Sequence, residues 1–373
     1  MRAVAVVPAE RAVTVIENHP APGRLARNQV RLRVLDVGVC GTDREIAAFE
    51  YGTPPAGSSY LVLGHESLAE VVEVDAACQA LRPGDLAVIM VRRPCPHAEC
   101  TACRAGRQDF CYTGDFTERG IKGQHGFMTE LVVDDCGFIV PVPNELREVG
   151  VLIEPLTIAE KALLQLWQVQ QRLPWACPVD PGQPAQHCHR AVVIGAGPVG
   201  LLGMLVLIKA GFETYVYSRE PAPNAKSKLI EAAGAAYISS QQTDVTALAA
   251  QVGNIDLVYE AAGASRVAFD VIRVLGTNGV FIFTGVPGRK APTPVDTDLI
   301  MRDLVLKNQV IFGTVNAGRE AYEVAVRDLQ EFTTRWPNVV RGLITGRFPV
   351  ERVPDLLTGR PHGIKNVVQI AKD

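Results

Sequence analysis

The stretch Ala191-Val192-Val193-Ile194-Gly195-Ala196-Gly197-Pro198-Val199-Gly200 decides the fold, because an apolar strand runs into a glycine-rich turn and then a helix. Gly195 permits the tight turn, Gly197 lets the backbone approach a pyrophosphate, and Gly200 allows close packing of the helix on the strand. The phosphates would lie at the helix N-terminus beside Pro198 and Val199, where free N–H groups attract anions. The stretch therefore predicts a dinucleotide site.

Strands and helices alternate through the part of the chain that follows this turn. This alternation is typical of a doubly wound parallel sheet, so we expect a Rossmann domain over residues 188–318. The expected strands are Ala191–Ile194, Thr214–Tyr217, Leu257–Glu260 and Gly279–Thr284, and the expected helices are Val199–Ala210, Ala225–Ala232 and Arg266–Val274.

Two of these strand ends offer groups to the cofactor. The second strand ends in Tyr217-Ser218-Arg219, where an NAD enzyme would carry an acidic residue. Ser218 and Arg219 can instead bind a 2′-phosphate, which favours NADP, while NAD stays open because Glu220 could turn inward. At a later strand end, backbone groups of Thr284 and Val286 can hold the nicotinamide carboxamide, although a plain buried strand end fits these residues nearly as well.

The first 140 residues contain short β segments between Gly, Pro and Asp residues, which is typical of a barrel-like domain. A helical pattern covers Val149–Val169, and a connector at Leu173–His189 places a domain boundary there. We therefore expect a catalytic domain at 1–187 and a segment at 319–373, with a helix and a closing strand, that returns to it. The expected N-terminal strands are Ala3–Val7, Gln29–Val39, Ser67–Val74, Asp85–Met90 and Phe127–Val133; the C-terminal elements are Ala321–Thr333 and Asn366–Ile370.

A thiol, an imidazole and carboxylates in the first domain predict a catalytic zinc site. Cys40 ends an apolar strand, and His65 and Glu66 lie at the start of the next one. A catalytic zinc takes three protein ligands and keeps one position open. Glu154 is the candidate third ligand, and Glu66 is an alternative or exchanging ligand. Each residue alone has a plainer interpretation, as a core thiol or a solvated carboxylate, so the combination carries the prediction.

Four of the nine cysteines crowd into one lobe at about residues 92–113. Four thiolates at this spacing can close a tetrahedron, which predicts a structural zinc and thus two zinc ions per chain. His97 could replace Cys95 as a ligand. The remaining cysteines are scattered, so the pattern indicates metal binding rather than a disulfide framework. The lobe ligands are Cys95, Cys100, Cys103 and Cys111.

Composition excludes several classes of protein. The 373 residues carry a net charge of −3 with Lys and Arg scattered, so no basic face for nucleic acid is expected. The most apolar stretch, Leu201–Ile208, is far shorter than the roughly 20 residues that span a bilayer. We therefore expect a cytoplasmic protein that binds no membrane.

Further motifs lie at residues 39–46, 61–66, 91–93, 118–121, 125–128 and 154–161. Together they resemble the zinc-containing medium-chain alcohol dehydrogenase superfamily, and the match is closer to its archaeal-type glucose (aldose) 1-dehydrogenase branch. The resemblance covers nearly the whole chain. It implies a GroES-like β barrel, a Rossmann domain, an active site in the cleft between them, and a homodimer or homotetramer.

The resemblance also implies a role for each matching residue of the metal site. Cys40, His65 and Glu154 match the catalytic zinc ligands, and Glu66 matches the neighbouring carboxylate. Thr42 matches the hydroxyl that contacts the reacting alcohol and its proton path.

The same resemblance implies residues that bind the substrate. Glu118 matches a carboxylate that holds sugar hydroxyls, and Asn316 matches an amide near both sugar and nicotinamide. Two positions depart from the family pattern, since Val91 replaces an Asn that contacts sugar in some relatives and Leu306 replaces a His. Both changes replace a hydrogen-bonding side chain with an apolar one. The lobe also has two extra residues between its first two thiols.

The predicted activity is therefore zinc-dependent transfer of hydride from the anomeric carbon of an aldose, with glucose as the expected sugar, to NADP or NAD, giving an aldonolactone. A polyol or simple alcohol dehydrogenase on the same fold is the first alternative. A non-catalytic nucleotide-binding or redox-sensing protein is the second, and the retained Cys40, His65 and Glu154 argue against it.

Overall fold

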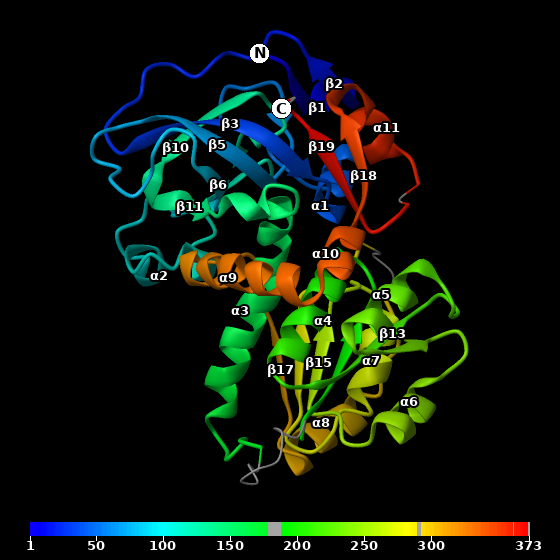
Figure 1. Ribbon diagram of the computed structural model, residues 1–373. Helices are drawn as coiled ribbons and strands as arrows, with labels where there is room; N and C mark the ends of the chain where they lie inside the picture. Colours follow the sequence, from blue (N-terminus) through cyan, green and yellow to red (C-terminus); the bar gives the residue numbers. More distant parts are fainter. Residues whose placement is uncertain (178–187, 289–291, 361, 372–373) are drawn as a thin grey trace. The chain divides into compact units, whose positions relative to one another are not determined.

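The structure is a computed structural model that describes residues 1–177, 188–288, 292–360 and 362–371 (Figure 1). It forms two compact units. The first comprises Met1–Thr157, Asn316–Thr334 and Leu343–Asp373, and the second comprises Ile158–Val315 and Arg335–Gly342. Most of the connector on which the sequence places a domain boundary, residues 178–187, lies outside the described residues.

A seven-stranded sheet forms the main part of the first unit, with strand order β11-β6-β5-β3-β19-β18 and with β10 also pairing with β3. Its central strand, β3, pairs antiparallel with the C-terminal strand β19, and Val37 of β3 lies opposite Val368 of β19. The last strands of the chain thus complete a sheet that the first 150 residues begin. The strands are β3 (Gln29–Gly38), β5 (Glu66–Val74), β6 (Leu86–Ile89), β10 (Leu131–Asp135), β11 (Ile139–Val142), β18 (Ile344–Pro349) and β19 (Lys365–Gln369).

Two smaller sheets complete the first unit. Apolar side chains from the strands pack into one core that includes Val4, Leu32 and Phe127, all fully buried. This burial stabilises the barrel that carries the site residues. The strands are β1 (Ala3–Val7), β2 (Ala12–Ile16) and β4 (Leu61–Val62) in one sheet, and β7 (Arg92–Arg93), β8 (Thr117–Arg119) and β9 (Gly123–Gln124) in the other.

One predicted strand begins later than expected. The segment from Phe127 was predicted as a strand, but β10 begins only at Leu131. The backbone N–H groups of residues 126–128 instead each donate one hydrogen bond to a carbonyl of residues 62–64. Thr129 forms an isolated β-bridge with Ala3. The apolar pattern that predicted a strand therefore reflects burial against β4 and its neighbours.

Among its described residues, the first unit also contains three short helices. None of them was predicted, because each is too short to show a helical period. They are α1 (Gly41–Ala47), α2 (Thr101–Arg104) and α11 (Val353–Thr358), while the longer α9 (Arg319–Arg335) corresponds to the predicted C-terminal helix.

The second unit is a six-stranded parallel sheet in the order β14-β13-β12-β15-β16-β17. This order is the doubly wound pattern of dinucleotide-binding folds, which confirms the predicted fold class. Fully buried Val192, Val258 and Phe281 lie in its core. The strands are β12 (Arg190–Ile194), β13 (Glu213–Ser218), β14 (Ala236–Ser239), β15 (Leu257–Glu260), β16 (Val280–Phe283) and β17 (Val310–Gly313).

Helices connect these parallel strands, as crossover connections require. The long α3 (Ile153–Gln170) begins in the first unit and continues into the second. The other helices of the second unit are α4 (Pro198–Lys209), α5 (Ala225–Ala233), α6 (Val245–Val252), α7 (Ser265–Ile272), α8 (Thr297–Leu306) and α10 (Pro337–Leu343).

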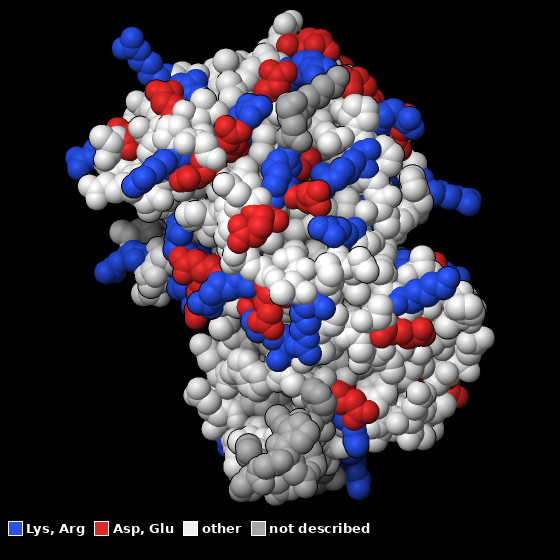
Figure 2. Space-filling view, in the orientation of Figure 1, with Lys and Arg blue, Asp and Glu red and all other residues white. Residues whose placement is uncertain are grey.

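Charged side chains of both signs are interspersed on the face shown in Figure 2. This arrangement agrees with the small net charge of −3. Among the described residues, no helix combines the length and the apolar character that crossing a bilayer requires.

A small cluster of aromatic rings lies beside β4 in the first unit. His125 Nδ1 accepts a hydrogen bond from the Val62 N–H at 3.1 Å. Its ring stacks on Tyr60, with centroids 5.1 Å apart, and meets His19 edge-on at 5.2 Å. Burial lowers the pKa of His125 to about 4, and the charges of His19 and Arg119 act in the same direction.

This cluster predicts a specific pH dependence of stability. Between pH 6.5 and about 4 the unfolded imidazole takes up a proton that the folded His125 refuses, so the unfolded state binds more protons. The free energy of unfolding should therefore fall as the pH falls through this window. We expect His125→Asn to reduce this slope in urea unfolding measured at several pH values, and His362→Asn, at an exposed histidine, to leave it unchanged. Equal slopes for wild type and His125→Asn would contradict the assignment.

Candidate active site

The glycine-rich turn between β12 and α4 has the geometry that a dinucleotide needs. Gly195 has φ +101°, and a Cβ there would lie 2.9 Å from the Cβ of Ala262. A Cβ on Gly200 would lie 2.2 Å from the carbonyl oxygen of Gly195, whereas one on Gly197 would meet no heavy atom within 4 Å. The first and third glycines are thus required by the fold, and the second leaves open space at the start of α4, where Pro198 is the first helical residue.

The residues proposed for the 2′-phosphate lie at the end of β13. Ser218 is half-buried and Arg219 is exposed. Glu220 does not turn inward, because its side chain is 61% exposed and pairs with Lys226 at 3.8 Å. The position at which an acidic residue would select NAD therefore carries a hydroxyl and a guanidinium.

A buried carboxylate that the sequence did not single out organises the neighbouring loops. Glu260 ends β15 and accepts hydrogen bonds from the N–H groups of Ala262 and Gly263 at 2.9 and 2.8 Å. The Thr284 hydroxyl donates to the Glu260 carbonyl at 2.7 Å, and Val286 beyond it is 69% exposed. Glu260 thereby fixes the loops after β15 and β16, which places the backbone proposed to hold the nicotinamide.

The first unit brings together three of the predicted metal ligands. Cys40 is the residue immediately before α1, and His65 and Glu66 lie at the start of β5. One ligand atom from each lies within 4.8 Å of the other two, and all three types are accepted by zinc. Glu154 is not one of this close set. The structure therefore gathers the alternative carboxylate, Glu66, rather than the first candidate, around the thiol and the imidazole.

Asp43 orients the imidazole of this set. Its carboxylate accepts hydrogen bonds from the N–H groups of Cys40 at 2.8 Å and Gly64 at 3.3 Å. His65 Nδ1 lies 3.5 Å from Asp43 Oδ1 and has no closer hydrogen-bond partner among the described residues. Burial alone would lower the pKa of His65, but the charge of Asp43 outweighs it and raises this pKa. A carboxylate beside one ring nitrogen is the usual arrangement when the other nitrogen binds a metal.

Lys365 is a functional residue that the sequence did not reveal. Its ammonium is fully buried and donates to both carboxylate oxygens of Glu66, at 2.8 and 2.5 Å, and to the Val39 carbonyl at 3.3 Å. Gly38 makes room for this pair, because a Cβ there would lie 2.0 Å from Glu66 Oε2. Burial lowers the pKa of Lys365, but the charges of Glu66 and Cys40 outweigh it and raise this pKa, so the ammonium keeps its charge.

Glu154 and Thr42 lie close to this set in the first unit. Glu154 is 8% exposed, and burial raises its pKa to about 7, with the charge of His65 opposing and that of Glu66 adding to the shift. Its carboxyl therefore gains or loses a proton near neutral pH. Thr42 is a half-buried residue in the first turn of α1, two residues after Cys40.

A second buried set matches the residues proposed to bind the sugar. Glu118 Oε1 accepts from Arg92 Nε at 3.0 Å and Nη2 at 2.9 Å, and from Asn316 Nδ2 at 3.2 Å. Arg92 lies over the ring of Phe116, 3.8 Å from its centroid, and holds the carboxylate in place. All these donors reach Oε1, so among the described residues Oε2 receives none and is left for a hydroxyl of a ligand. Arg92 belongs to the motif at residues 91–93, and the structure gives it this positioning contact.

Val91 and Leu306 are the two positions at which this chain carries an apolar residue where relatives carry Asn or His. Val91 is 2% exposed at the entry to β7, and its carbonyl accepts from the Arg119 N–H at 3.0 Å. Leu306 is 66% exposed at the end of α8 in the second unit. Neither side chain can donate a hydrogen bond to a sugar.

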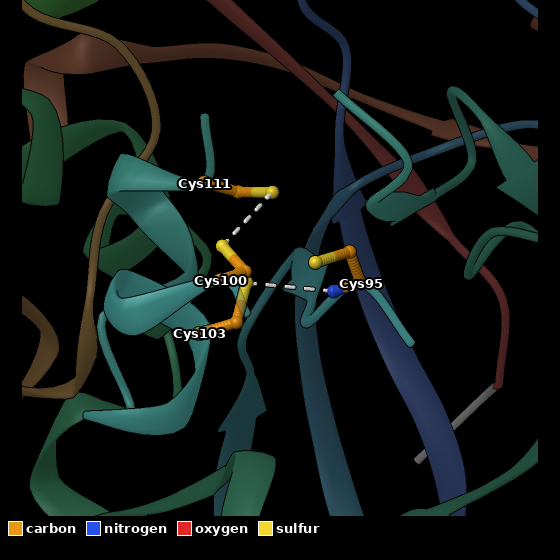
Figure 3. A group of neighbouring side chains, drawn as sticks. All are labelled: Cys95, Cys100, Cys103 and Cys111. Carbon is orange, nitrogen blue, oxygen red and sulfur yellow. Dashed lines mark hydrogen bonds between the residues drawn. The ribbon is translucent and has the colours of Figure 1, made fainter. Parts of the chain in front are cut away.

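The cysteine lobe forms the second candidate metal centre. All four thiol groups lie within 4.8 Å of one another and point toward a shared centre (Figure 3). Cys100 and Cys103 belong to the turn of α2, and Cys111 follows a short 3-10 helix. Burial would raise the pKa of Cys111, but the Thr113 hydroxyl and nearby N–H groups lower it to about 6, which favours the thiolate that zinc binds.

His97 does not take the place of Cys95 in this lobe. Its Nε2 lies 2.5 Å from Asp115 Oδ2 and its Nδ1 lies 3.7 Å from Glu99 Oε1. The two extra residues between Cys95 and Cys100 are accommodated without separating their thiols. Among the described residues, the ligand atoms that lie close together in the lobe are those of the four cysteines.

The remaining four cysteines correct one expectation. Cys78 pairs with Cys136 and Cys177 pairs with Cys188 in disulfides. The sequence pattern favoured metal binding over a disulfide framework, and the structure has two disulfides in addition to the four-cysteine lobe. The first pair joins residues 58 positions apart, which only the folded barrel brings together.

A barrel followed by a doubly wound sheet, with a Cys-His-Glu set and a four-cysteine lobe in the first unit, defines a zinc-type alcohol dehydrogenase. Residues 26–144 match the family model of the alcohol dehydrogenase GroES-like domain. Residues 147–370 match the model of the glucose dehydrogenase C-terminus. The chain belongs to the glucose dehydrogenase family, as the sequence resemblance predicted.

Individual relatives agree with this assignment. The chain is 38% identical to a glucose 1-dehydrogenase of Methanocella arvoryzae and 37% identical to one of Thermoproteus tenax, and in both cases 99% of each chain is covered. It is also similar to the structure of Haloferax mediterranei glucose dehydrogenase in complex with NADP, Zn and gluconolactone. That similarity has a TM-score of 0.88 at 30% identity and covers 100% of both chains.

The lobe geometry predicts which substitution removes metal. Cys103→Ala should lower the zinc content by one ion per chain and destabilise the first unit, because a structural zinc contributes directly to folding. His97→Ala should keep the full zinc content, since His97 turns toward Asp115. Elemental analysis of dialysed protein measures both. Metal loss in His97→Ala, or none in Cys103→Ala, would contradict the four-cysteine site.

Proposed function

We propose that the chain is a zinc-dependent dehydrogenase that oxidises an aldose, with glucose as the main candidate, at its anomeric carbon to an aldonolactone and reduces NADP. The observation that carries the proposal is that two sets of side chains lie in one unit. The first is the thiol, imidazole and carboxylate of Cys40, His65 and Glu66 at zinc-ligand spacing. The second is Glu118, whose Oε1 is held by the protein and whose Oε2 accepts no hydrogen bond from the described residues. The charges of Glu118, Arg92 and His65 all act on the phenol of Tyr51, so both sets lie near one region.

The residues of the first set fit a zinc ion. Cys40, His65 and Glu154 would hold it, with Glu66 as the alternative or exchanging carboxylate, and a bound zinc would supply the Lewis acidity that acidifies a hydroxyl. NADP supplies the acceptor for the hydride. The relative from Haloferax mediterranei was solved with NADP, Zn and gluconolactone, which supports both cofactors here.

The chain itself orients the substrate and moves the proton. Glu118 Oε2 would accept a hydrogen bond from a sugar hydroxyl while Arg92 and Asn316 hold Oε1. The Thr42 hydroxyl and ordered water would take the proton of the reacting hydroxyl toward solvent. A site that binds hydroxyls in this way discriminates against alcohols that lack them.

A substrate panel tests this function. With NADP, we expect zinc-dependent oxidation of glucose, galactose or xylose and little oxidation of sorbitol or ethanol. Glu118→Gln should lower kcat/KM for the best sugar by roughly 10-fold or more, because it removes a hydrogen bond between the sugar and a charged group. Glu50→Gln, at an exposed carboxylate, is the control. Efficient turnover of ethanol or sorbitol but not of aldoses would support the alcohol or polyol alternative instead.

Arg219 is proposed to select NADP. Arg219→Ala should raise KM for NADP by roughly 10-fold or more, since it removes a charged donor to the 2′-phosphate, and should leave KM for NAD nearly unchanged. Arg273→Ala, at an exposed arginine elsewhere in the second unit, should alter neither value. Steady-state kinetics with both cofactors gives the comparison. An equal effect of Arg219→Ala on NADP and NAD would contradict this role.

A cytoplasmic location and a homodimeric or homotetrameric assembly belong to the same proposal. Support for assembly comes from α8, where Met301, Val305 and Leu306 are 65–75% exposed, next to the edge strand β17. Apolar side chains gathered in this way are typical of a surface that another subunit covers.

A further inference from the structure

A third group of metal-ligating side chains lies at the start of the second unit's sheet. Ligand atoms of Cys177, Cys188 and His189 lie within 4.8 Å of one another. Cys177 precedes residues 178–187, and His189 directly precedes β12. These residues take no part in the dinucleotide turn or in the two metal centres of the first unit.

The imidazole of His189 is held as a metal ligand would be. Its Nε2 lies 2.9 Å from the carbonyl oxygen of Trp175, and its ring lies on the Trp175 ring with centroids 4.3 Å apart. A neutral imidazole that donates from Nε2 to this carbonyl keeps its lone pair on Nδ1. The indole fixes the ring plane, so the imidazole is oriented before any metal binds.

A carboxylate lies on the other side of the ring. Asp256 Oδ1 is 3.9 Å from His189 Nδ1. Asp256 is itself fixed, since Oδ2 accepts from the Arg190 N–H at 2.8 Å and Oδ1 accepts from Asn254 Nδ2 at 2.7 Å. Its negative charge favours a cation at this place.

The two sulfur atoms are joined in a disulfide, and the other disulfide offers an internal comparison. Cys188 is exposed and can meet a reductant, whereas Cys78 is 4% exposed. Among the described residues, no histidine or carboxylate forms a metal-ligand group with Cys78 and Cys136. Of the disulfides in the described part of the chain, only Cys177–Cys188 is both accessible to a reductant and next to an oriented imidazole.

We propose that Cys177, Cys188 and His189 form a redox-gated zinc site. A dithiol reductant supplies two electrons and two protons, so that the S–S bond breaks, the reductant becomes a disulfide and two thiols form. One Zn²⁺ then binds both thiolates and the imidazole with release of two protons, and water takes the fourth position at the exposed side. Thiolate and imidazole are the donor types that select zinc. A small-molecule disulfide oxidant then accepts two electrons and two protons and becomes two thiols, which restores the Cys177–Cys188 disulfide and releases the ion.

Zinc stoichiometry of the full chain tests this proposal, independently of the proposed activity. Protein is oxidised or treated with a phosphine reductant, incubated with ZnCl₂, freed of excess metal by gel filtration and measured by elemental analysis and native mass spectrometry. The reduced form should hold one more zinc per chain than the oxidised form. Cd²⁺ in place of zinc should add ultraviolet thiolate-to-metal absorbance in the reduced form only.

Matched variants separate this site from the other thiols. Cys188→Ser and His189→Ala should abolish or strongly weaken the additional binding, while Cys136→Ser, which opens the other disulfide, should keep it. Circular dichroism and thermal unfolding check that each variant folds. No redox-dependent difference in wild type, or the same difference in Cys188→Ser, would overturn the proposal.

Discussion

The buried ion pair of Lys365 with Glu66 is the interaction on which the metal site depends. The buried carboxylates of Asp43, Glu66 and Glu154 gather beside the half-buried thiol of Cys40. Removing such charges from water is costly unless they are paired. The ammonium of Lys365 provides this pairing, and loss of one partner of such a buried pair costs about 3–5 kcal/mol. Its place in β19 joins the last strand of the chain to the metal site.

The two buried sets of the first unit use the same physical device. In the metal set, Asp43 lies beside Nδ1 of His65, and the other ring nitrogen is left for a ligand. In the second set, Arg92 and Asn316 hold Oε1 of Glu118, and Oε2 is left for a ligand. Groups fixed in this way lose little freedom when a ligand binds. The arrangement links the rigid barrel to the hydroxyl selectivity proposed for the site.

In the second unit, backbone geometry rather than charge prepares the cofactor site. Gly195 and Gly200 are required because any side chain would collide with neighbouring atoms, and Glu260 ties two loops together through backbone N–H groups. By contrast, Ser218 at the end of β13 is half-buried and Arg219 is exposed, so the side chains proposed to bind the 2′-phosphate are accessible to it.

The sequence by itself determined what depends on neighbouring residues. The glycine-rich turn, the alternation of strands and helices and the spacing of Cys95, Cys100, Cys103 and Cys111 all act over a few positions, and they predicted the doubly wound sheet and the family. The class of the catalytic metal site also followed, because Cys40, His65 and Glu66 each adjoin a recognisable strand end.

Only the tertiary structure decided which distant groups meet. Lys365 and Glu66 are 299 residues apart, Asn316 and Glu118 are 198 apart, and Cys78 and Cys136 are 58 apart. No periodicity or motif encodes such contacts, because they depend on how β19 pairs with β3 and how the barrel closes. For the same reason, only the fold brings the carboxylate of Glu66, paired with Lys365, within 4.8 Å of the ligand atoms of Cys40 and His65.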